Sequence, residues 1–389
     1  RLAALYPENR DEIAEIAAQL RRIMRYMDIQ YGIDNPLFLD PKADREYFAT
    51  TVVPWMFKYA FTIGKVNRLK APVVDYLRRF TQNPSLLDII TQHFFPATPA
   101  FFALSYFTLY LDYHYPVGGT GTFPKALTDF VRDHGGTIAT GTEIVAVDPE
   151  RRCVRDAAGS EHTYRRLVWA ADLKTLYRVV DIDALNDAAA ADAVRQRRAA
   201  IEDKSGGDSV LTIYLAVDLP PDYFAERASA HFFYTPRRDG QSKAGPYPVG
   251  KPRAAVEAWL DDFLALTTYE VAVPALRDPA LAPPGKTGLI VSVLFDYALT
   301  QEIEARGWYD AFKRRCETTM IDTLDATIFP GLQDAVLDVF SATPLTLARV
   351  TGNTDGAITG WAFTNNPVPA ESHLHKVARS VRTPIPGVH

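Results

Sequence analysis

Cysteine is scarce in this sequence of 389 residues, which contains only Cys153 and Cys316. Two cysteines cannot build the disulfide framework of a small secreted domain. We expect both side chains to be buried as small apolar groups in a reducing compartment, with the cytoplasm as the default location. The hydrophobic content of 47% is enough to bury a large core, and the length predicts about two to three domains.

An excess of positive charge is also missing. The chain has 42 Lys and Arg residues against 47 Asp and Glu residues, which gives a formal net charge of -5 at pH 7. A basic run interleaved with aromatic residues would indicate a nucleic-acid interface, and the sequence contains no such run. We therefore expect no nucleic-acid partner.

Common motifs for hydrolysis, metal binding and phosphate binding are missing as well. No serine lies in a Gly-x-Ser-x-Gly setting, and His373 and His375 lack a third ligand nearby, so no metal site is predicted. Residues 284–287, Pro-Gly-Lys-Thr, end like a phosphate loop, but Ala280 stands where the first glycine is required. Asp261 and Asp262 are interpreted as surface residues of a helix. Catalytic residues therefore stay unknown from the sequence.

Glycine, in contrast, is concentrated in residues 115–124, Tyr-Pro-Val-Gly-Gly-Thr-Gly-Thr-Phe-Pro. Glycines let the backbone bend and approach a ligand closely, and Pro124 suits the first turn of a helix. A helix is predicted next, because Leu127, Phe130 and Val131 recur at helical spacing before a terminating Gly-Gly pair.

Short strands are predicted after that helix. Residues 137–139 and 144–148 are β-branched and alternating, and a turn is expected at residues 156–159. Residues 166–170 are predicted to form a last buried strand that ends at Ala171. A glycine loop, a helix and strands in this order are typical of half of a nucleotide-binding sheet.

Residues 1–114 are predicted to be all-helical. An amphipathic helix follows Pro7, and further helices are expected at residues 52–63 and 71–80. Asn83-Pro84 and Thr98-Pro99 each have the pattern of a helix cap followed by proline in the first turn.

An uncharged aromatic run covers residues 94–111. A transmembrane span would need about 20 apolar residues, and this run contains Pro96 and Pro99 and ends at Asp112. The other two interpretations are a buried core helix, or an aromatic wall for a long apolar substrate that also contacts lipid. We leave all three open at this point.

Residues 205–345 have the pattern of an antiparallel sheet covered by helices. A polar, alanine-rich surface helix is predicted up to Lys204, and a long helix at residues 308–329. A long loop is expected at residues 237–253. Strands are predicted at residues 210–217, 230–235, 287–297 and 336–341.

Three blocks together resemble one known family. The first is Tyr-Pro-x-Gly-Gly-x-Gly at residues 115–121, followed by Thr-Glu-Ile-Val-Ala-Val and Val-Trp-Ala-Ala-Asp. The second, residues 274–285, is similar to a Pro-x-x-x-Asp-Pro-x-x-Ala-Pro-x-Gly segment. The third is Thr343-Pro344 followed by Gly-Ala-Ile-Thr-Gly-Trp. These blocks resemble the flavin-dependent phytoene desaturase family, which also contains carotenoid isomerases and retinol saturases.

The resemblance implies positions for the flavin and the substrate. Gly118 and Gly119 would lie near the isoalloxazine, and the backbone of Ile144 beside the adenine. Ala171 and Trp361 are the other cofactor-binding residues that it implies. The implied substrate-binding residues are aromatic side chains of the uncharged run and its end: Phe101, Phe102, Tyr106, Tyr110 and Tyr113.

The sequence also departs from the family pattern. No Gly-x-Gly-x-x-Gly occurs, because Pro124 stands where the third glycine after Gly119 and Gly121 is required. The chain ends where the family continues into a strand and a glycine-rich helix. We therefore interpret the sequence as the interior of a longer protein, and expect it to be inactive by itself.

The expected fold class is α+β or α/β, with a partial glutathione-reductase-like FAD-binding domain, a substrate domain with an antiparallel sheet, and a helical subdomain. The expected boundaries are 1–114 for the helical, membrane-facing part, 115–182 for the middle of the FAD-binding domain, 183–345 for the substrate domain, and 346–389 for the return to the FAD-binding domain.

The function implied by the resemblance is that of an FAD-dependent oxidoreductase that desaturates, saturates or isomerises a long lipophilic polyene. The scarcity of acids, bases and nucleophiles fits flavin chemistry, in which the cofactor accepts the electrons. Peripheral contact with a membrane is a further expectation, and the oligomeric state is not predicted. Two alternatives stay open: a flavin amine-oxidase-like enzyme, and a binding domain that takes up an apolar ligand without catalysis.

Overall fold

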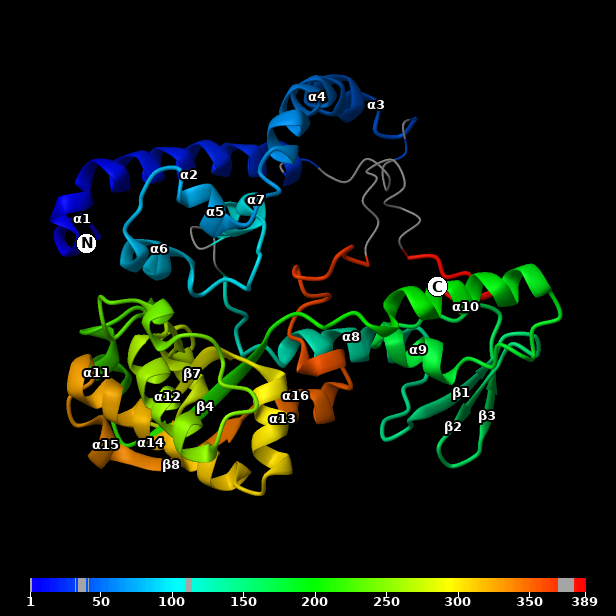
Figure 1. Cartoon of the computed structure of the whole chain (residues 1–389). Helices are drawn as coiled ribbons and strands as arrows, with labels where there is room; N and C mark the ends of the chain where they lie inside the picture. The colour runs from blue at the N-terminus through cyan, green and yellow to red at the C-terminus, as the bar shows by residue number, and fades with distance from the viewer. Residues whose placement is uncertain (1, 32, 34–39, 41, 110–113, 370–380) are drawn as a thin grey trace. The chain divides into compact units, whose positions relative to one another are not determined.

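The computed structural model describes residues 2–31, 33, 40, 42–109, 114–369 and 381–389 (Figure 1). The chain forms two compact units. The first unit contains residues 1–115, 213–293 and 310–340, and the second contains residues 116–212, 294–309 and 341–389. Each unit is described by itself.

The amino-terminal part of the first unit is helical, as predicted. Its core is made of apolar side chains that include Ile16, Leu77 and Leu104, all buried. The long helix α2 carries the predicted amphipathic stripe. The elements are α1 (Leu2–Leu5), a 3-10 turn (Pro7–Asn9), α2 (Arg10–Tyr31), α3 (Arg45–Tyr47), a π-helical turn (Phe48–Val52), α4 (Val53–Asn67), α5 (Val73–Leu77), α6 (Pro84–Thr91) and α7 (Ala100–Tyr106).

One of the two predicted caps is confirmed and the other is wrong. The side chain of Asn83 accepts hydrogen bonds from the backbone N–H groups of Ser85 and Leu86, and caps α6. Thr98 does not cap α7, because its hydroxyl donates to the carbonyl of Phe95 at 2.6 Å and Pro99 is the residue that precedes the helix. The helix therefore begins at Ala100.

The aromatic run does not form one continuous helix. Within it, α7 is 7 residues long, with Ala100, Ala103 and Leu104 buried. Over the residues that the structure describes, no helix is both long enough and apolar enough to cross a bilayer.

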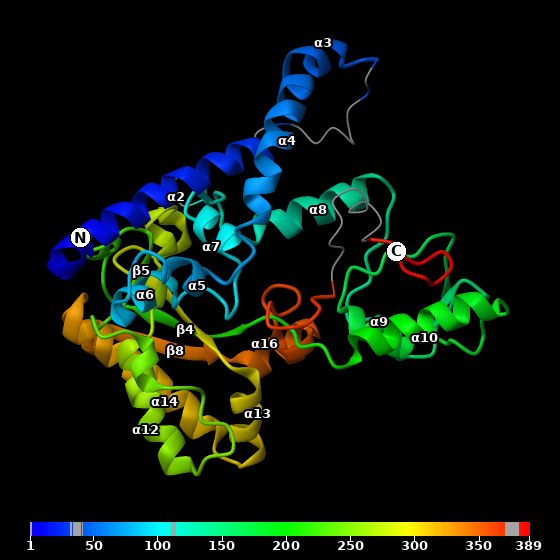
Figure 2. The same ribbon diagram turned by 45° about the horizontal axis from the view of Figure 1, so that its top comes forward.

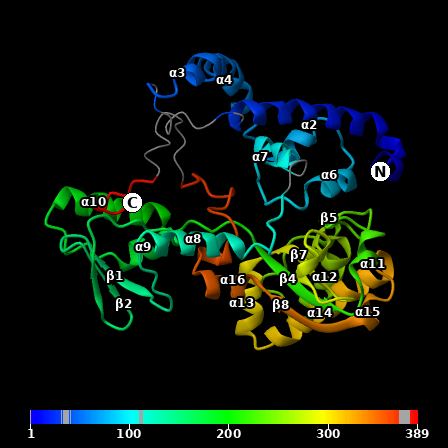
Figure 3. The same cartoon turned by 180° about the vertical axis from the view of Figure 1, so that it is seen from behind.

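The remainder of the first unit is built around a five-stranded sheet, in the order β5-β6-β7-β4-β8 (Figures 1 and 3). Pairs β5-β6 and β6-β7 are antiparallel. The strand predicted at residues 287–297 is confirmed as β7, which alternates buried and half-buried residues along its whole length. The strands are β4 (Ser209–Val217), β5 (His231–Tyr234), β6 (Tyr269–Ala272), β7 (Thr287–Phe295) and β8 (Val336–Ala342).

Helices of this region bury their apolar faces. Phe263 of α12 and Phe312, Cys316 and Met320 of α14 are buried. The sequence predicted α14 and a helix with Asp261 and Asp262 on its surface, and both residues are exposed on α12, but it did not predict β6. The helices are α11 (Pro221–Ala225), α12 (Arg253–Leu266), α14 (Tyr309–Thr327) and α15 (Leu332–Ala335), with 3-10 turns at Gln241–Ala244, Pro274–Leu276 and Pro279–Leu281.

The second unit combines a three-stranded antiparallel sheet, β1-β2-β3, with helices. Its core includes Val147, Leu176 and Val194, together with Ile385 and Val388 from the end of the chain. The predicted alanine-rich helix is α10, capped by Asp187. The elements are α8 (Thr122–Asp133), β1 (Ile144–Asp148), β2 (Cys153–Asp156), β3 (Glu161–Thr163), α9 (Leu173–Val179), α10 (Ala188–Glu202), α13 (Tyr297–Ala305), α16 (Pro344–Thr351) and a 3-10 turn (Thr354–Gly356).

Two strand predictions in this unit are wrong. Residues 137–139 are exposed and form no strand. Residues 166–170 are not a buried strand, because Val168 is 73% exposed and only Leu167 forms a bridge, in parallel with Val388. The N–H groups of Leu167 and Trp169 do donate to the carbonyls of Gly387 and His389, so this segment has a backbone partner, and what fails there is the burial of Val168. No strand pairing is found for residues 137–139 within the described part of the chain.

Candidate functional site

The second unit contains a pocket of about 180 Å³ where residues 171–173 meet residues 353–361. Two cofactor-binding residues predicted from the sequence, Ala171 and Trp361, line it. The full lining is Ala171, Asp172, Leu173, Gly206, Asn353, Thr354, Ala357, Thr359, Gly360 and Trp361.

Asp172 holds the two sides of this pocket together. One carboxylate oxygen, Oδ1, accepts hydrogen bonds from the backbone N–H of Thr175 at 2.8 Å and from its hydroxyl at 3.0 Å, so Asp172 caps α9. The other oxygen, Oδ2, accepts from the backbone N–H of Thr354 at 2.8 Å and from its hydroxyl at 2.6 Å. Partial burial alone would raise the pKa of Asp172, but the hydrogen bonds from Thr354 and Thr175 outweigh it and lower that pKa.

Gly206 and Gly207 bring a second segment into the site. Gly206 forms an antiparallel bridge with Trp361, and the N–H of Gly207 donates to the carbonyl of Gly360 at 2.7 Å. A Cβ atom at Gly206 would lie 2.2 Å from the carbonyl oxygen of Thr354. The close backbone approach therefore requires glycine at position 206.

The other three predicted cofactor residues are not among those that line this pocket. Gly118 and Gly119 precede α8 with φ angles of 84° and 85°, a backbone conformation that favours glycine. The hydroxyl of Thr122 donates to the carbonyl of Gly119 at 2.8 Å and closes this turn. Ile144 begins β1, is half-buried, and packs against the same apolar core as Trp361.

The predicted substrate residues belong to the first unit. Phe101 is half-buried against the helical core, whereas Phe102 and Tyr106 are 44% and 38% exposed. The rings of Phe102 and Tyr106 stack with centroids 6.1 Å apart. Tyr110 and Tyr113 lie outside the described residues.

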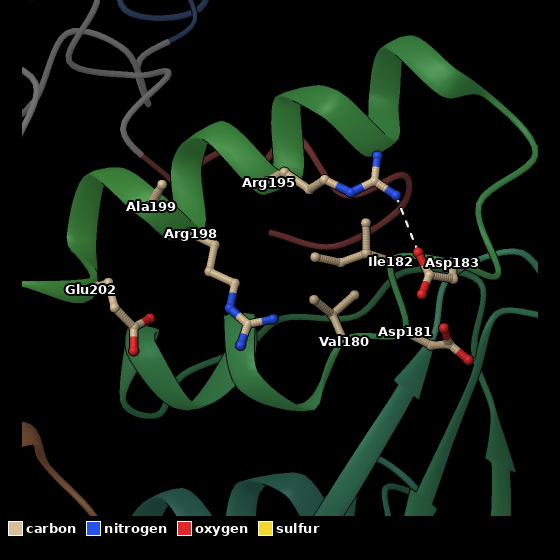
Figure 4. Close-up of a pocket in the computed structure, with 8 residues that line it drawn as sticks. All are labelled: Val180, Asp181, Ile182, Asp183, Arg195, Arg198, Ala199 and Glu202. Atoms are coloured by element: carbon tan, nitrogen blue, oxygen red, sulfur yellow. Dashed lines mark hydrogen bonds and ion pairs between the residues drawn. The ribbon is translucent and has the colours of Figure 1, made fainter.

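A larger pocket of about 530 Å³ lies between residues 180–183 and α10 (Figure 4). Arg195 pairs with Asp183 at 3.1 Å at one end, and Arg198 points toward Val180 (Figure 4). None of the predicted site residues lines this pocket. Its charged side chains are exposed, so we do not assign it as the cofactor site.

Two half-buried titratable groups were not predicted from the sequence. Burial, and secondarily the charge of Asp296, raises the pKa of Asp208 to about 6. In the first unit, burial lowers the pKa of His93 to about 4, against an opposing effect of Glu270. Only spatial proximity reveals these environments, since no motif marks either residue.

No metal site is found in the described part of the chain, where no three His, Cys, Asp or Glu residues are grouped suitably. His373 and His375 lie outside the described residues.

No protein-family model and no curated protein sequence matches the chain. Solved structures do match. Wild-type putrescine oxidase bound to putrescine aligns over 98% of this chain and 69% of its own, with 11% identity and a TM-score of 0.55. An oxidoreductase from Methanosarcina mazei aligns over 86% of this chain and 66% of its own, with 15% identity and a TM-score of 0.51.

These likenesses define the fold class. The mixed arrangement of helices with antiparallel sheets matches the fold of FAD-binding oxidoreductases, as expected from the sequence. The chain spans about half to two thirds of the length of the structures that it matches, from 52% of a UDP-galactopyranose mutase to 69% of putrescine oxidase.

Proposed function

We propose that this chain belongs to an FAD-dependent oxidoreductase and that the pocket around Asp172 holds part of the flavin. The supporting observation is that Ala171 and Trp361, chosen from separate sequence blocks, line the same pocket. The FAD-binding oxidoreductase fold supports the same proposal.

The residues of the pocket fit one segment of the dinucleotide. Ligand pockets for a whole drug-sized molecule are about 300–1,000 Å³, so a volume of about 180 Å³ suits a ring or a sugar-like chain. Asp172, Thr354 and Asn353 are polar, and no Lys or Arg is among the lining residues. An ionised Asp172 disfavours the pyrophosphate, so the ribityl or ring portion is the better match.

A bound flavin would supply the electron acceptor. The chain's own residues would position the flavin and shield it from water. Both oxygens of Asp172 are occupied by Thr354 and Thr175, so Asp172 acts as a positioning residue rather than an acid or base. Gly118 and Gly119 have positive φ angles and leave their turn without side chains. The backbone of Ile144 remains the proposed neighbour of the adenine.

For the substrate we propose a long lipophilic polyene, whose C–C double bonds are desaturated, saturated or isomerised. Phe101, Phe102 and Tyr106 support this assignment, because an uncharged aromatic surface binds an apolar chain and excludes water. Tyr110 and Tyr113 continue the same sequence run.

Amine oxidation is the second candidate. The specific observation in its favour is the likeness to putrescine oxidase over 98% of this chain. A polyene and a diamine differ in charge and length, so direct assays of both substrate classes separate the two candidates.

The test uses the natural protein that contains this chain. We expect it to purify yellow, with about one FAD per chain released on denaturation, as for a preformed cofactor site. Trp361→Ala and Asp172→Asn should weaken FAD binding in a fluorescence titration of the apoprotein, whereas Leu127→Ser on the exposed face of α8 should not.

The 389-residue chain by itself is expected to purify colourless, and stoichiometric flavin absorbance would refute that expectation. A natural protein that refuses FAD would overturn the proposed function and favour a binding domain for apolar ligands. Turnover of a linear diamine without turnover of any polyene would overturn the substrate assignment alone.

A further inference from the structure

The helix α4 has an apolar face that points to solvent. Val53, Met56, Phe57 and Phe61 are 45%, 57%, 65% and 77% exposed. Their spacing of three and four residues places them on one side of the helix. Such a set of exposed large apolar side chains is unusual for a surface helix, whose outward face is normally polar.

The opposite face of α4 is attached to the rest of the first unit. Thr62 is buried there, and the indole N–H of Trp55 donates to the backbone carbonyl of Ile29 in α2. The rings of Trp55 and Tyr59 pack 4.9 Å apart. The helix α4 therefore lies against α2 by one face (Figure 2). The apolar side chains of its other face are exposed.

The charge around this face is positive. Residues 47–74 contain no Asp or Glu but contain Lys58, Lys65, Arg68 and Lys70, although the whole chain carries a net charge of -5. Lys65 follows Phe61 by one turn on the same side of α4. Positive charge is thus concentrated beside the exposed apolar side chains.

A basic pocket of about 230 Å³ lies at the same end of α4. It is lined by Gln19, Arg22, Ile23, Tyr26, Lys65, Arg68, Leu69 and Tyr76. No carboxylate is among these residues, and the structure gives Arg22, Lys65 and Arg68 no ion pair within the part of the chain it describes. Three guanidinium or ammonium groups around a small pocket suit a phosphate group.

We propose that α4 is a membrane-docking helix, which buries its apolar face at the surface of an anionic bilayer while the basic pocket binds the phosphate of a lipid headgroup. Interfacial helices combine a strongly apolar face with Lys and Arg residues at its edge. Basic residues near an anionic leaflet add binding energy. A lipid surface supplies both an apolar layer and phosphates, and so matches the two features together.

This inference is independent of the flavin. It also differs from lipid contact by the aromatic run, because the two surfaces use different helices and can be tested by separate substitutions.

The experiment is a flotation assay of the full chain with vesicles of phosphatidylcholine, with and without about one third phosphatidylglycerol. We expect binding to the anionic vesicles to be about tenfold stronger or more, and to weaken as salt is raised. Equal binding to both vesicles, or to neither, would overturn the proposal.

Substitutions locate the surface. Phe57→Ser with Phe61→Ser, and Lys65→Glu with Arg68→Glu, should each weaken vesicle binding by about tenfold or more. The matched control for the first pair is Leu127→Ser with Phe130→Ser, whose side chains are 68% and 61% exposed on α8. Arg165→Glu with Arg166→Glu, also exposed, controls for the charge change.

All four double variants must retain the circular dichroism of the original chain, because each changes exposed residues. Equal loss of binding in the α8 control would overturn the assignment to α4. The assignment would also be overturned if the original chain self-associated and the variant Phe57→Ser with Phe61→Ser were monomeric. A second copy of the chain would then cover α4.

Discussion

Each unit contains a titratable side chain whose charged form is disfavoured by burial, but the two groups are of opposite type. In the first unit, His93 packs against Phe94 and Phe233 with ring centroids 4.1 and 5.0 Å away, and its buried Nε2 atom has no hydrogen-bond partner among the residues that the structure describes. In the second unit, Asp208 is partly buried near the charge of Asp296. Burial is the main cause of both shifts, and it lowers the pKa of the base and raises that of the acid.

The difference predicts opposite responses to acid. A base with a lowered pKa stabilises the folded state above its unfolded pKa, and this contribution is lost as the pH falls. An acid with a raised pKa contributes stability at low pH, which is lost as the pH rises through its folded pKa. Mild acidification should therefore weaken the first unit and strengthen the second.

The largest effect is expected from a substitution that destabilises the second unit alone. Gly206→Ala places a Cβ atom 2.2 Å from the Thr354 carbonyl oxygen, a backbone atom that cannot move away easily. We expect a loss of about 3 kcal/mol or more in the free energy of unfolding, measured by urea denaturation.

Gly64→Ala is the matched control in the first unit. Position 64 is inside α4 and no heavy atom lies within 4 Å of the added Cβ. Alanine should be neutral there or stabilising by up to about 1 kcal/mol, because it favours the helix. Equal destabilisation by the two substitutions would mean that the close approach at Gly206 does not exist.

Position 206 illustrates what the sequence could not predict. The glycine-rich turn at Gly118, the helix α8 after it and the strand β7 follow from local patterns, since turn chemistry and alternation are properties of neighbouring residues. Resemblance to a family selected Ala171 and Trp361. The pairing of Gly206 with Trp361 joins distant segments, and no local pattern contains that information.

The same limit explains the missed elements. The strand β6 has 4 residues and directly precedes Val273-Pro274, so its alternation is too short to recognise, and its partners β5 and β7 define it. Conversely, the pattern at residues 166–170 predicted a buried strand, but Val168 is exposed. Strand formation depends on partners that the pattern does not specify.

The protonation of His93 should cause the next largest loss of folding stability. With a folded pKa of about 4 and an unfolded value near 6.5, the first unit should lose about 2 kcal/mol between about pH 7.5 and pH 5. His93→Phe keeps an aromatic ring among Phe94 and Phe233 but cannot bind a proton. Hydrogen exchange of the α6 and α7 amides should then become less sensitive to this pH change than in the original chain.

An unchanged pH response in His93→Phe would show that another group causes the acid sensitivity of the first unit. His231→Phe is not a useful control, because the imidazole of His231 contacts Glu270 at 2.9 Å. His134→Gln, at the exposed end of α8 in the second unit, serves instead.

The ionisation of Asp208 should cause the smallest of these changes in folding stability with pH, and its sign is opposite to that of His93. Its folded pKa of about 6 lies above the unfolded value of 3.8, so the penalty for its charge should grow by about 1 kcal/mol between about pH 5 and pH 7.5. Asp208→Asn removes this charge, and should protect the amides of α13 more at the higher pH than at the lower. Asp11→Asn, on the exposed start of α2, should leave those amides unchanged. If Asp208→Asn instead destabilised α13 at both pH values equally, the carboxylate would be contributing through hydrogen bonds, and the contrast between the two units would reduce to His93 alone.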